Sequence, residues 1–369
     1  MDSLLVTHLP NIHYLCGFTG SAAALLVSGR GSILFTDGRY RTQAKEELIS
    51  AKINSAKVSG ANVDRVRIVI ACQAPLLAAA EWLAAQRNKS TPASSYPIPV
   101  GIEPESITAG MRDRLASVLK GLKGTRKVRL RSAPPLVERA RMVKDAGEIQ
   151  CIRRAVELGA SLFLTARQKI RPGVAEVAVA AAMEYEARCA GAEGMSFPTI
   201  LASGARSAIV HGRASSARIP RRGFVVCDFG VILAGYCSDR TRTVYVGRPS
   251  EEARQFYKAV LEAQQAAIAA VRPGVTCADV DGAARRVLRQ RKLARYFTHS
   301  TGHGLGLEIH EPPRLTAGQT LKLEPGMVVT IEPGAYVPGK WGVRIEDVVV
   351  VTASGCEVLT PTDKELVVI

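Results

Sequence analysis

The chain has 369 residues, of which 47% are hydrophobic, and this length predicts two domains with enough apolar side chains to fill their cores. The sequence contains no run of about 18 uncharged apolar residues, so we expect no membrane span. The N-terminal residues do not resemble a signal peptide, so we expect a cytoplasmic protein with reduced cysteines. The net charge of +16 would suit a nucleic-acid partner, but the cations are dispersed, so we expect no specific nucleic-acid binding and no membrane association.

Residues 1–133 are predicted to form an α/β domain, because short β-branched runs alternate with helical segments. The expected elements are strands over 22–27 and 32–35 with a turn at 29–31, a helix over 41–48, a strand over 67–71 and a helix over 75–87. The paired prolines Pro134 and Pro135 continue neither a helix nor a strand comfortably, so residues 134–144 are assigned to a linker.

The second domain, residues 145–369, opens with a predicted helix over 145–168 and contains an internal repeat. The sequence Ile170–Val174 recurs as Val271–Val275, 101 residues later. Each half then carries two acids on strand-like sequence, Asp228 and Asp239 in the first half and, 104 and 107 residues later, Glu332 and Glu346 in the second. A duplicated unit that delivers two carboxylates from each copy to one centre would explain these spacings.

Each of these acids alone could be a turn residue, a helix cap or part of a surface ion pair. Four of them, next to apolar runs and with duplicated spacing, indicate a shared cation, because isolated buried carboxylates are costly. His303 lies among the glycines 302, 304 and 306, which allow the backbone to approach a site closely. Four carboxylates and one imidazole could hold two divalent ions, and such ligands suit manganese first, with cobalt or zinc as alternatives.

At this point the chain resembles a known family. The run His299–Glu311 fits the signature of the proline-specific branch of the pita-bread metallopeptidases, which comprises prolidase and aminopeptidase P. Pro10–Leu15 and Thr36–Tyr40 resemble the creatinase-type N-terminal domain. The resemblance implies an α/β (α+β) protein in which a creatinase-type α/β domain precedes a pita-bread catalytic domain with pseudo-two-fold symmetry.

The resemblance also implies roles for the metal ligands. Asp228 would bind one ion through both oxygens, Asp239 and Glu346 would bridge the two ions, and His303 and Glu332 would complete the ligands of the other ion. Glu332 is the candidate for taking the proton of the attacking water.

Further residues match positions that contact the substrate or support the ligands. His211 and His310 match two histidines that steady the substrate and the developing oxyanion. Arg344 matches an arginine that supports the ligands, and Thr241 could orient Asp239 by a hydrogen bond. Arg314 matches a prolidase arginine that pairs with the carboxylate of a dipeptide, although it could also be an ordinary loop arginine.

The expected function is therefore a dinuclear-metal exopeptidase that cleaves small peptides with proline at the second position, with a slight preference for the Xaa-Pro dipeptidase over the aminopeptidase P that acts on longer peptides. A basic, non-enzymatic binding protein on the same scaffold is the alternative from another class. The resemblance implies a homodimer in which His13 and residues 37–40 of one subunit lie near the site of the other.

Overall fold

The computed structural model describes residues 3–29, 31–55, 66–85, 98–121, 128–360 and 362–369. The chain divides into two compact units, Met1–Arg139 and Ala140–Ile369. Helix α5 (Leu136–Met142) occupies much of the segment 134–144 that the sequence assigns to a linker. Within the described residues, no helix is both long and apolar enough to cross a membrane.

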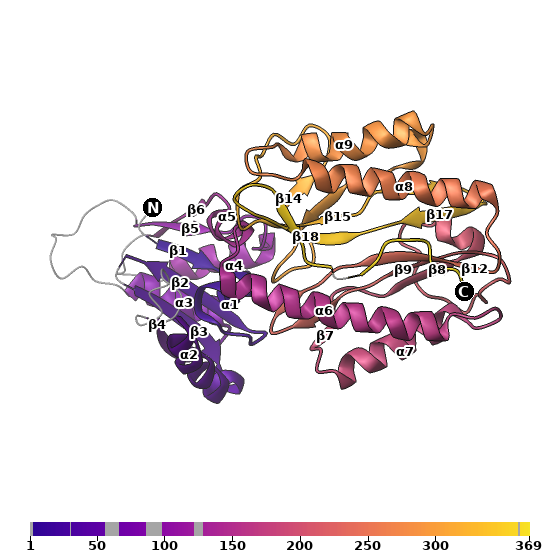
Figure 1. Cartoon of the computed structure of the whole chain (residues 1–369). Coiled ribbons are helices and arrows are strands. Elements are labelled where there is room, and N and C mark those ends of the chain that lie inside the picture. The colour runs from indigo at the N-terminus through magenta and orange to yellow at the C-terminus, as the bar shows by residue number, and fades with distance from the viewer. Residues whose placement is uncertain (1–2, 30, 56–65, 86–97, 122–127, 361) are drawn as a thin grey trace. The chain divides into compact units, whose positions relative to one another are not determined.

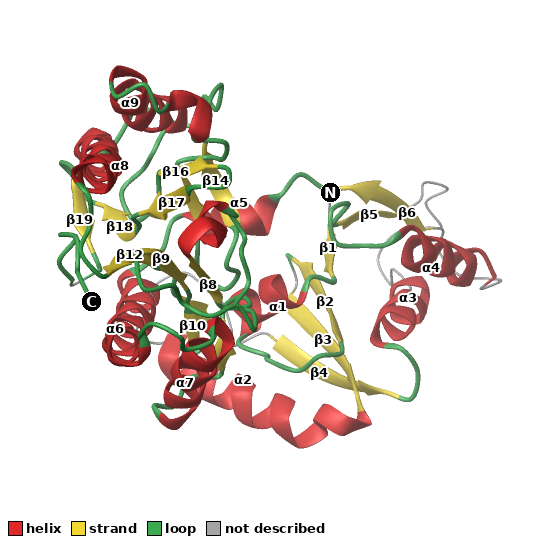
Figure 2. Cartoon of the chain, turned by 90° about the vertical axis from the view of Figure 1, so that its right-hand side faces the viewer, coloured by secondary structure: helices red, strands yellow, loops and turns green. Residues whose placement is uncertain are grey.

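The first unit is a six-stranded mixed sheet in the order β4-β3-β2-β1-β5-β6, with helices on both faces (Figure 2). Its elements are β1 (Ser3–Val6), α1 (Leu9–Cys16), β2 (Ala23–Ser28), β3 (Gly31–Asp37), η1 (Gly38–Tyr40), α2 (Arg41–Ser55), β4 (Val66–Ala71), α3 (Pro75–Ala85), β5 (Ile98–Ile102), α4 (Ala109–Gly121) and β6 (Val128–Ser132). The predicted strands and helices of this unit are present, while Arg30 of the predicted turn and residues 86–87 of the predicted helix lie outside the described part.

Two apolar cores cover the faces of this sheet, because successive residues of a strand point to opposite sides. Phe35 packs with Leu76 and Leu115, from α3 and α4, on one side. Its neighbour Leu34 packs with Ile12 of α1 and with the α2 residues Ala44 and Leu48 on the other. The alternation of strand residues therefore accounts for the three layers of this unit.

The second unit contains two helix pairs and the strands that follow each pair (Figure 1). The elements of its first half are α6 (Ala146–Lys169), α7 (Glu176–Cys189), β7 (Gly194–Met195), β8 (Ile200–Ser203), η3 (Gly204–Ala208), β9 (Gly223–Asp228), β10 (Val231–Leu233), β11 (Tyr236–Cys237) and β12 (Thr241–Val246). Those of its second half are α8 (Glu251–Ala270), α9 (Cys277–Gln290), η4 (Ala294–Tyr296), β13 (Gly302–Gly304), β14 (Glu311–Leu315), β15 (Val328–Ile331), β16 (Gly334–Val337), β17 (Trp341–Arg344), β18 (Asp347–Val351) and β19 (Cys356–Val358).

The internal repeat predicted from the sequence is confirmed by equivalent hydrogen bonds in the two halves. The amide of Gly173 donates to the carbonyl of Ile219 at 2.8 Å, and the amide of Gly274 donates to that of Leu323 at 2.9 Å. Both glycines have positive φ, +83° and +80°, which other residues rarely adopt. The same turn therefore closes the loop between the two helices of each pair.

The strand registers repeat as well. Ser203 of β8 lies opposite Val225 of β9, and Gly304 of β13 lies opposite Val329 of β15. Ser203 and its equivalent Gly304 are 101 residues apart along the chain, and Val225 and its equivalent Val329 are 104 residues apart. These are the offsets of the sequence repeat. By the same register, the counterpart of His303 in the first half is Ala202. The two halves thus share a backbone but differ in the side chains that they present.

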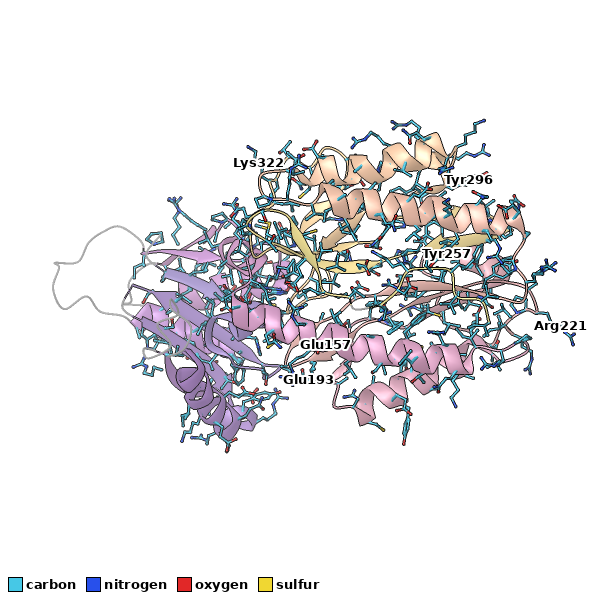
Figure 3. The ribbon with its side chains drawn as sticks, viewed as in Figure 1. Glu157, Glu193, Arg221, Tyr257, Tyr296 and Lys322 are labelled. Atoms are coloured by element: carbon cyan, nitrogen blue, oxygen red, sulfur yellow. The ribbon has the colours of Figure 1, made fainter. Side chains whose placement is uncertain are left out.

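The C-terminal residues bind the second unit together. The amide of Ile369 donates to the carbonyl of Tyr245 in β12 at 2.8 Å, and the amide of Tyr245 donates to the carbonyl of Val367 at 2.9 Å. The hydroxyl of Tyr257, labelled in Figure 3 and part of α8, donates to the carbonyl of Lys364 at 2.7 Å. The Lys364 ammonium in turn lies 2.7 Å from the carboxylate of Asp347, the first residue of β18. The strand start next to Glu346 is therefore fixed by buried polar contacts.

Candidate metal centre

The ends of the central strands deliver the four predicted carboxylates. Asp228 ends β9, Asp239 precedes β12, Glu332 follows β15, and Glu346 stands between β17 and β18. Across the β9–β12 pair, Asp228 lies directly opposite Thr241. Because the halves repeat, equivalent strand ends meet at one place, although the residues are more than 100 positions apart in the sequence.

The structure brings His303 and three of these carboxylates together. The Nε2 atom of His303 lies 3.5 Å from Oδ2 of Asp239 and 3.4 Å from Oε1 of Glu332. One potential ligand atom each from Asp239, His303 and Glu346 lies within 4.8 Å of the others. A single cation between these atoms could contact all three.

Asp228 joins this group through Arg344 and Thr241. The Arg344 guanidinium donates from Nη2 to Oδ2 of Asp228 and from Nε to the Thr241 hydroxyl at 3.1 Å. The same hydroxyl donates to Oε2 of Glu346 at 2.8 Å. Thr241 therefore orients Glu346, which corrects the expectation that it orients Asp239.

The imidazole of His303 is fixed so that Nε2 faces the carboxylates. Its Nδ1 lies 3.0 Å from the Gly304 carbonyl, so Nδ1 carries the proton and donates to that oxygen, while the backbone amide of His303 donates to the Thr330 hydroxyl at 3.0 Å. Strand β13 can run this close to β15 because residue 302 is glycine: a Cβ there would lie 1.8 Å from the Thr330 carbonyl oxygen. Nε2 is therefore available as a ligand.

The site carries more negative charge than its own side chains can balance. Burial, together with the charge of Asp228, raises the pKa of Asp239 to about 6, and burial raises the pKa of Glu332 to about 7. Burial and the neighbouring carboxylates also raise the pKa of Glu346 well above its ordinary value. Burial alone would lower the pKa of His303, but Asp239 and Glu332 outweigh it and raise that pKa to about 9.

Two carboxylate oxygens among the described residues are buried without a hydrogen-bond partner, Oδ1 of Asp228 and Oε1 of Glu346. Unpaired buried oxygens of this kind are rare in native structures, because their desolvation is not repaid. Both belong to the predicted ligand set. Together with the raised pKa values, they show that these residues fit divalent cations, which would supply the missing partner charge.

The carboxylates open into a cavity of about 830 Å³. The predicted substrate residues His211, His310 and Arg314 all line it. The His310 ring packs edge to face on the His303 ring with centroids 4.4 Å apart, and burial and the neighbouring cations lower the pKa of His310 to about 4, which keeps this imidazole neutral. The further walls are made by Phe197, Pro198, Ile200, Val210, Arg213, His299, Ser300, Glu311, Pro312, Pro313, Gln319 and Leu321.

His211 lies in a turn after η3, and its position depends on Arg344. The Nη1 atom of Arg344 donates to the carbonyl of Val210 at 3.1 Å, next to His211. Arg314 is exposed on β14, and its Cα pairs with that of His303 across the β13–β14 ladder. Both histidines and the arginine are thus held at the cavity by the strands that carry the ligands.

The sequence did not point to Tyr336 and His299 as site residues. Arg344 donates from Nη1 to the Tyr336 hydroxyl at 2.7 Å, and this hydroxyl lies 3.0 Å from Nε2 of His299. Nδ1 of His299 lies 2.8 Å from the Ser300 carbonyl, and burial and the Arg344 charge lower the pKa of His299 to about 3. His299 is therefore neutral and accepts from Tyr336. Its position at the start of the glycine-rich motif was the available signal.

Both units match models of known protein families. A model of metallopeptidase family M24 matches residues 150–353, and a model of the creatinase/prolidase N-terminal domain matches residues 1–143. These matches confirm the family resemblance and the creatinase-type and pita-bread fold predicted from the sequence.

Full-length relatives show the same organisation. An uncharacterized peptidase of Bacillus subtilis (strain 168) is 36% identical and covers 100% of this chain and 96% of its own. An Xaa-Pro dipeptidase from Bacillus anthracis superposes with a TM-score of 0.87 at 35% identity, covering 100% of this chain and 95% of its own. An X-Pro aminopeptidase from Thermotoga maritima gives a TM-score of 0.86 at 34% identity, covering 100% and 98%.

Proposed function

Because this chain belongs to metallopeptidase family M24, and is therefore a peptidase that uses divalent metal ions, we propose that it is an Xaa-Pro exopeptidase with two ions per chain. The observation that carries this proposal is the cluster of four carboxylates and His303 that lines the cavity, with two buried oxygens that lack a hydrogen-bond partner. Asp228, Asp239, His303, Glu332 and Glu346 are the proposed ligands. Manganese is the proposed ion, since hard oxygen ligands with one imidazole suit it.

When bound, the two ions would polarise the scissile carbonyl and lower the pKa of an attacking water. Glu332 lines the cavity with Oε1 3.4 Å from Nε2 of His303, so its carboxylate can accept the proton of that water and pass it to the leaving nitrogen. His310 is neutral and faces the cavity, so it can donate a hydrogen bond to a carbonyl oxygen as negative charge develops there. His211 follows Val210, whose carbonyl accepts a hydrogen bond from Arg344. We propose that His211, from the first half of the catalytic unit, also donates a hydrogen bond to a carbonyl oxygen of the substrate.

Proline at the second position is proposed because the printed names of two similar proteins, an Xaa-Pro dipeptidase and an X-Pro aminopeptidase, share this requirement. The Xaa-Pro bond has no N–H, so a peptidase cannot hold it through that donor and needs contacts to the ring instead. The cavity offers apolar side chains for such contacts, including Phe197, Pro312 and Leu321.

Arg314 supports a preference for dipeptides. It lines the cavity, its Cα pairs with that of His303 across the β13–β14 ladder, and it is exposed. Its guanidinium can therefore pair with the carboxylate of a bound dipeptide, which longer peptides would place elsewhere. Aminopeptidase P activity stays the second candidate, because the similarity to the Thermotoga maritima X-Pro aminopeptidase is as extensive as that to the dipeptidase.

The test is a peptide panel on protein stripped of metal and reloaded with manganese, cobalt or zinc. We expect Xaa-Pro to be cleaved, Xaa-Ala to be cleaved poorly, and activity to be highest with manganese. Rapid cleavage of Xaa-Pro-Xaa with poor cleavage of Xaa-Pro would favour the aminopeptidase, and cleavage of Xaa-Ala as rapid as that of Xaa-Pro would refute proline specificity. The homodimer and the cytoplasmic location remain predictions, which sedimentation and fractionation can check. A nucleic-acid-binding scaffold without activity is not supported, because the chain belongs to a peptidase family and keeps the full ligand set.

A further inference from the structure

Buried ion pairs hold the loop that carries His310, and the proposed chemistry does not use them. This Glu311 cluster consists of Arg141, Lys144, Glu308 and Glu311. Lys144 Nζ lies 2.7 Å from Oε1 of Glu311, and the Arg141 guanidinium bonds to Oε2 of the same carboxylate. The side chains of Arg141, Lys144 and Glu311 are only 2%, 1% and 4% exposed.

The cluster fixes the loop at both of its ends. Arg141 also pairs with Glu308 at 2.9 Å, so a single guanidinium joins two residues on either side of His310. Gly306, at the start of the loop, lies against the same carboxylate: a Cβ on residue 306 would lie 2.6 Å from Oε1 of Glu311. We define the His310 loop as residues 305–310, between β13 and β14.

The anchors of this cluster belong to the framework that holds the metal ligands. The backbone amide of Lys144 donates to the carbonyl of Gly326 at 2.9 Å, just before β15, the strand that leads to Glu332. Cys237, which lies two residues before Asp239, donates from its backbone amide to the carbonyl of Gly306 at 2.7 Å. The His310 loop is thus tied to the strand ends of both halves.

An ion pair this deep is a poor device for stability alone, because desolvation of the charges consumes most of the attraction between them. What it does supply is one defined geometry for the loop. A glycine-containing loop has little intrinsic preference for a single conformation, and a misplacement of about 1 Å at a reacting centre can cost on the order of 100-fold in rate.

We infer that Arg141, Lys144 and Glu311 are positioning residues that hold the His310 loop so that the His310 imidazole faces the scissile peptide. The inference rests on the proposed function, since it assigns the cluster to the same reaction. The residues act through His310 and do not touch the substrate themselves in this scheme.

The test is a double-mutant cycle combined with hydrogen exchange on the manganese-loaded chain. Lys144→Met removes one charge at nearly constant side-chain length, and Arg141→Lys serves as a milder second variant should Lys144→Met not fold. Arg153→Met is the matched control, because Arg153 pairs with Glu357 at 2.9 Å on the surface of the same unit. Metal content is measured for each protein.

We expect Lys144→Met to lower kcat/KM about 10- to 100-fold when His310 is present and less than about 3-fold in the His310→Ala background. Exchange should accelerate in peptides that cover residues 304–311 and stay unchanged in peptides that cover helix α8 (Glu251–Ala270), for which the described residues show no hydrogen bond to the loop. The control should alter neither quantity.

Equal losses of kcat/KM in both backgrounds, loss of bound metal, or exchange that rises equally in both regions would overturn the inference, because the cluster would then be a general stabilising element. If the wild-type chain cleaves no Xaa-Pro peptide, the proposed function fails, but the exchange measurement still decides whether the cluster orders the loop.

Discussion

Replacing Arg344 by methionine should destabilise the metal-free protein far more than the metal-loaded protein. Arg344 is buried and donates to four acceptors, of which the carboxylate of Asp228 is charged and the Thr241 hydroxyl, the Tyr336 hydroxyl and the Val210 carbonyl are neutral. Without cations, its guanidinium is the main positive charge facing the four carboxylates, apart from the imidazole of His303.

The magnitude follows from the loss of one partner of a buried ion pair, which costs about 3–5 kcal/mol. For a domain of roughly 150–250 residues, each 1 kcal/mol changes the melting temperature by about 2–4 °C, so the metal-free variant should melt about 6–20 °C lower. With manganese bound, the ions compensate Asp228, and the decrease should be less than half as large.

The assay is thermal unfolding followed by circular dichroism, in a chelator and in excess manganese. Arg153→Met is the control, since its surface pair contributes about 1 kcal/mol or less. Equal decreases in both conditions would show that Arg344 acts by packing alone. A larger decrease in manganese would refute the reasoning that the cations and the guanidinium balance the same carboxylates.

Three further outcomes are expected. In a chelator, the melting temperature should fall as the pH rises from about 6.5 to about 8. The folded-state pKa values of Glu332 (about 7) and His303 (about 9) exceed those of the unfolded chain, so the stability that these groups contribute is lost as the pH rises through this window, at about 1.4 kcal/mol per pKa unit. Below about pH 6.5 the lowered pKa values of His299 and His310 act in the opposite direction and offset those of Asp239 and Glu332. A melting temperature that rises between about pH 6.5 and about pH 8 would contradict the assignment. Glu332→Ala in metal-loaded form should lose about 100- to 10,000-fold in kcat, and near-normal turnover would exclude Glu332 as the base. Gly302→Ala should lower the free energy of unfolding, measured by chemical denaturation, by about 3 kcal/mol or more, because the new Cβ would lie 1.8 Å from the Thr330 carbonyl oxygen. Gly355→Ala is the control and should lower it by less than about 0.5 kcal/mol, because a Cβ at residue 355 would meet no described atom within 4 Å. Similar decreases for both variants would show that β13 can move away from β15.

The sequence predicted the fold well where a pattern repeats along the chain. The two copies of the Pro-Gly turn and the offsets between the acid pairs fixed the duplication, and the registers of β8 with β9 and of β13 with β15 reproduce these offsets. The ligand set could be assembled for the same reason, because a repeat implies that equivalent strand ends meet.

The supporting contacts could not be predicted, because they join residues that share no local pattern. Thr241 could reach either Asp239 or Glu346, and only the paired strands show that its hydroxyl points to Glu346. Tyr336 and His299 are 37 positions apart, and nothing in the sequence indicates that one donates to the other. The ion pair between Lys144 and Glu311 joins residues that are 167 positions apart, so it was even less predictable from the sequence.

The repeat, in which Ala202 is the counterpart of His303, makes the two halves unequal at the point where they meet. A symmetric pair of units would offer both ions the same ligands, whereas in the proposed ligand set only one ion would receive a nitrogen donor. Borderline cations gain more from imidazole than hard ones do. A calorimetric titration of the stripped chain should therefore resolve two uptake steps of different affinity, and the gap between them should widen from manganese to zinc.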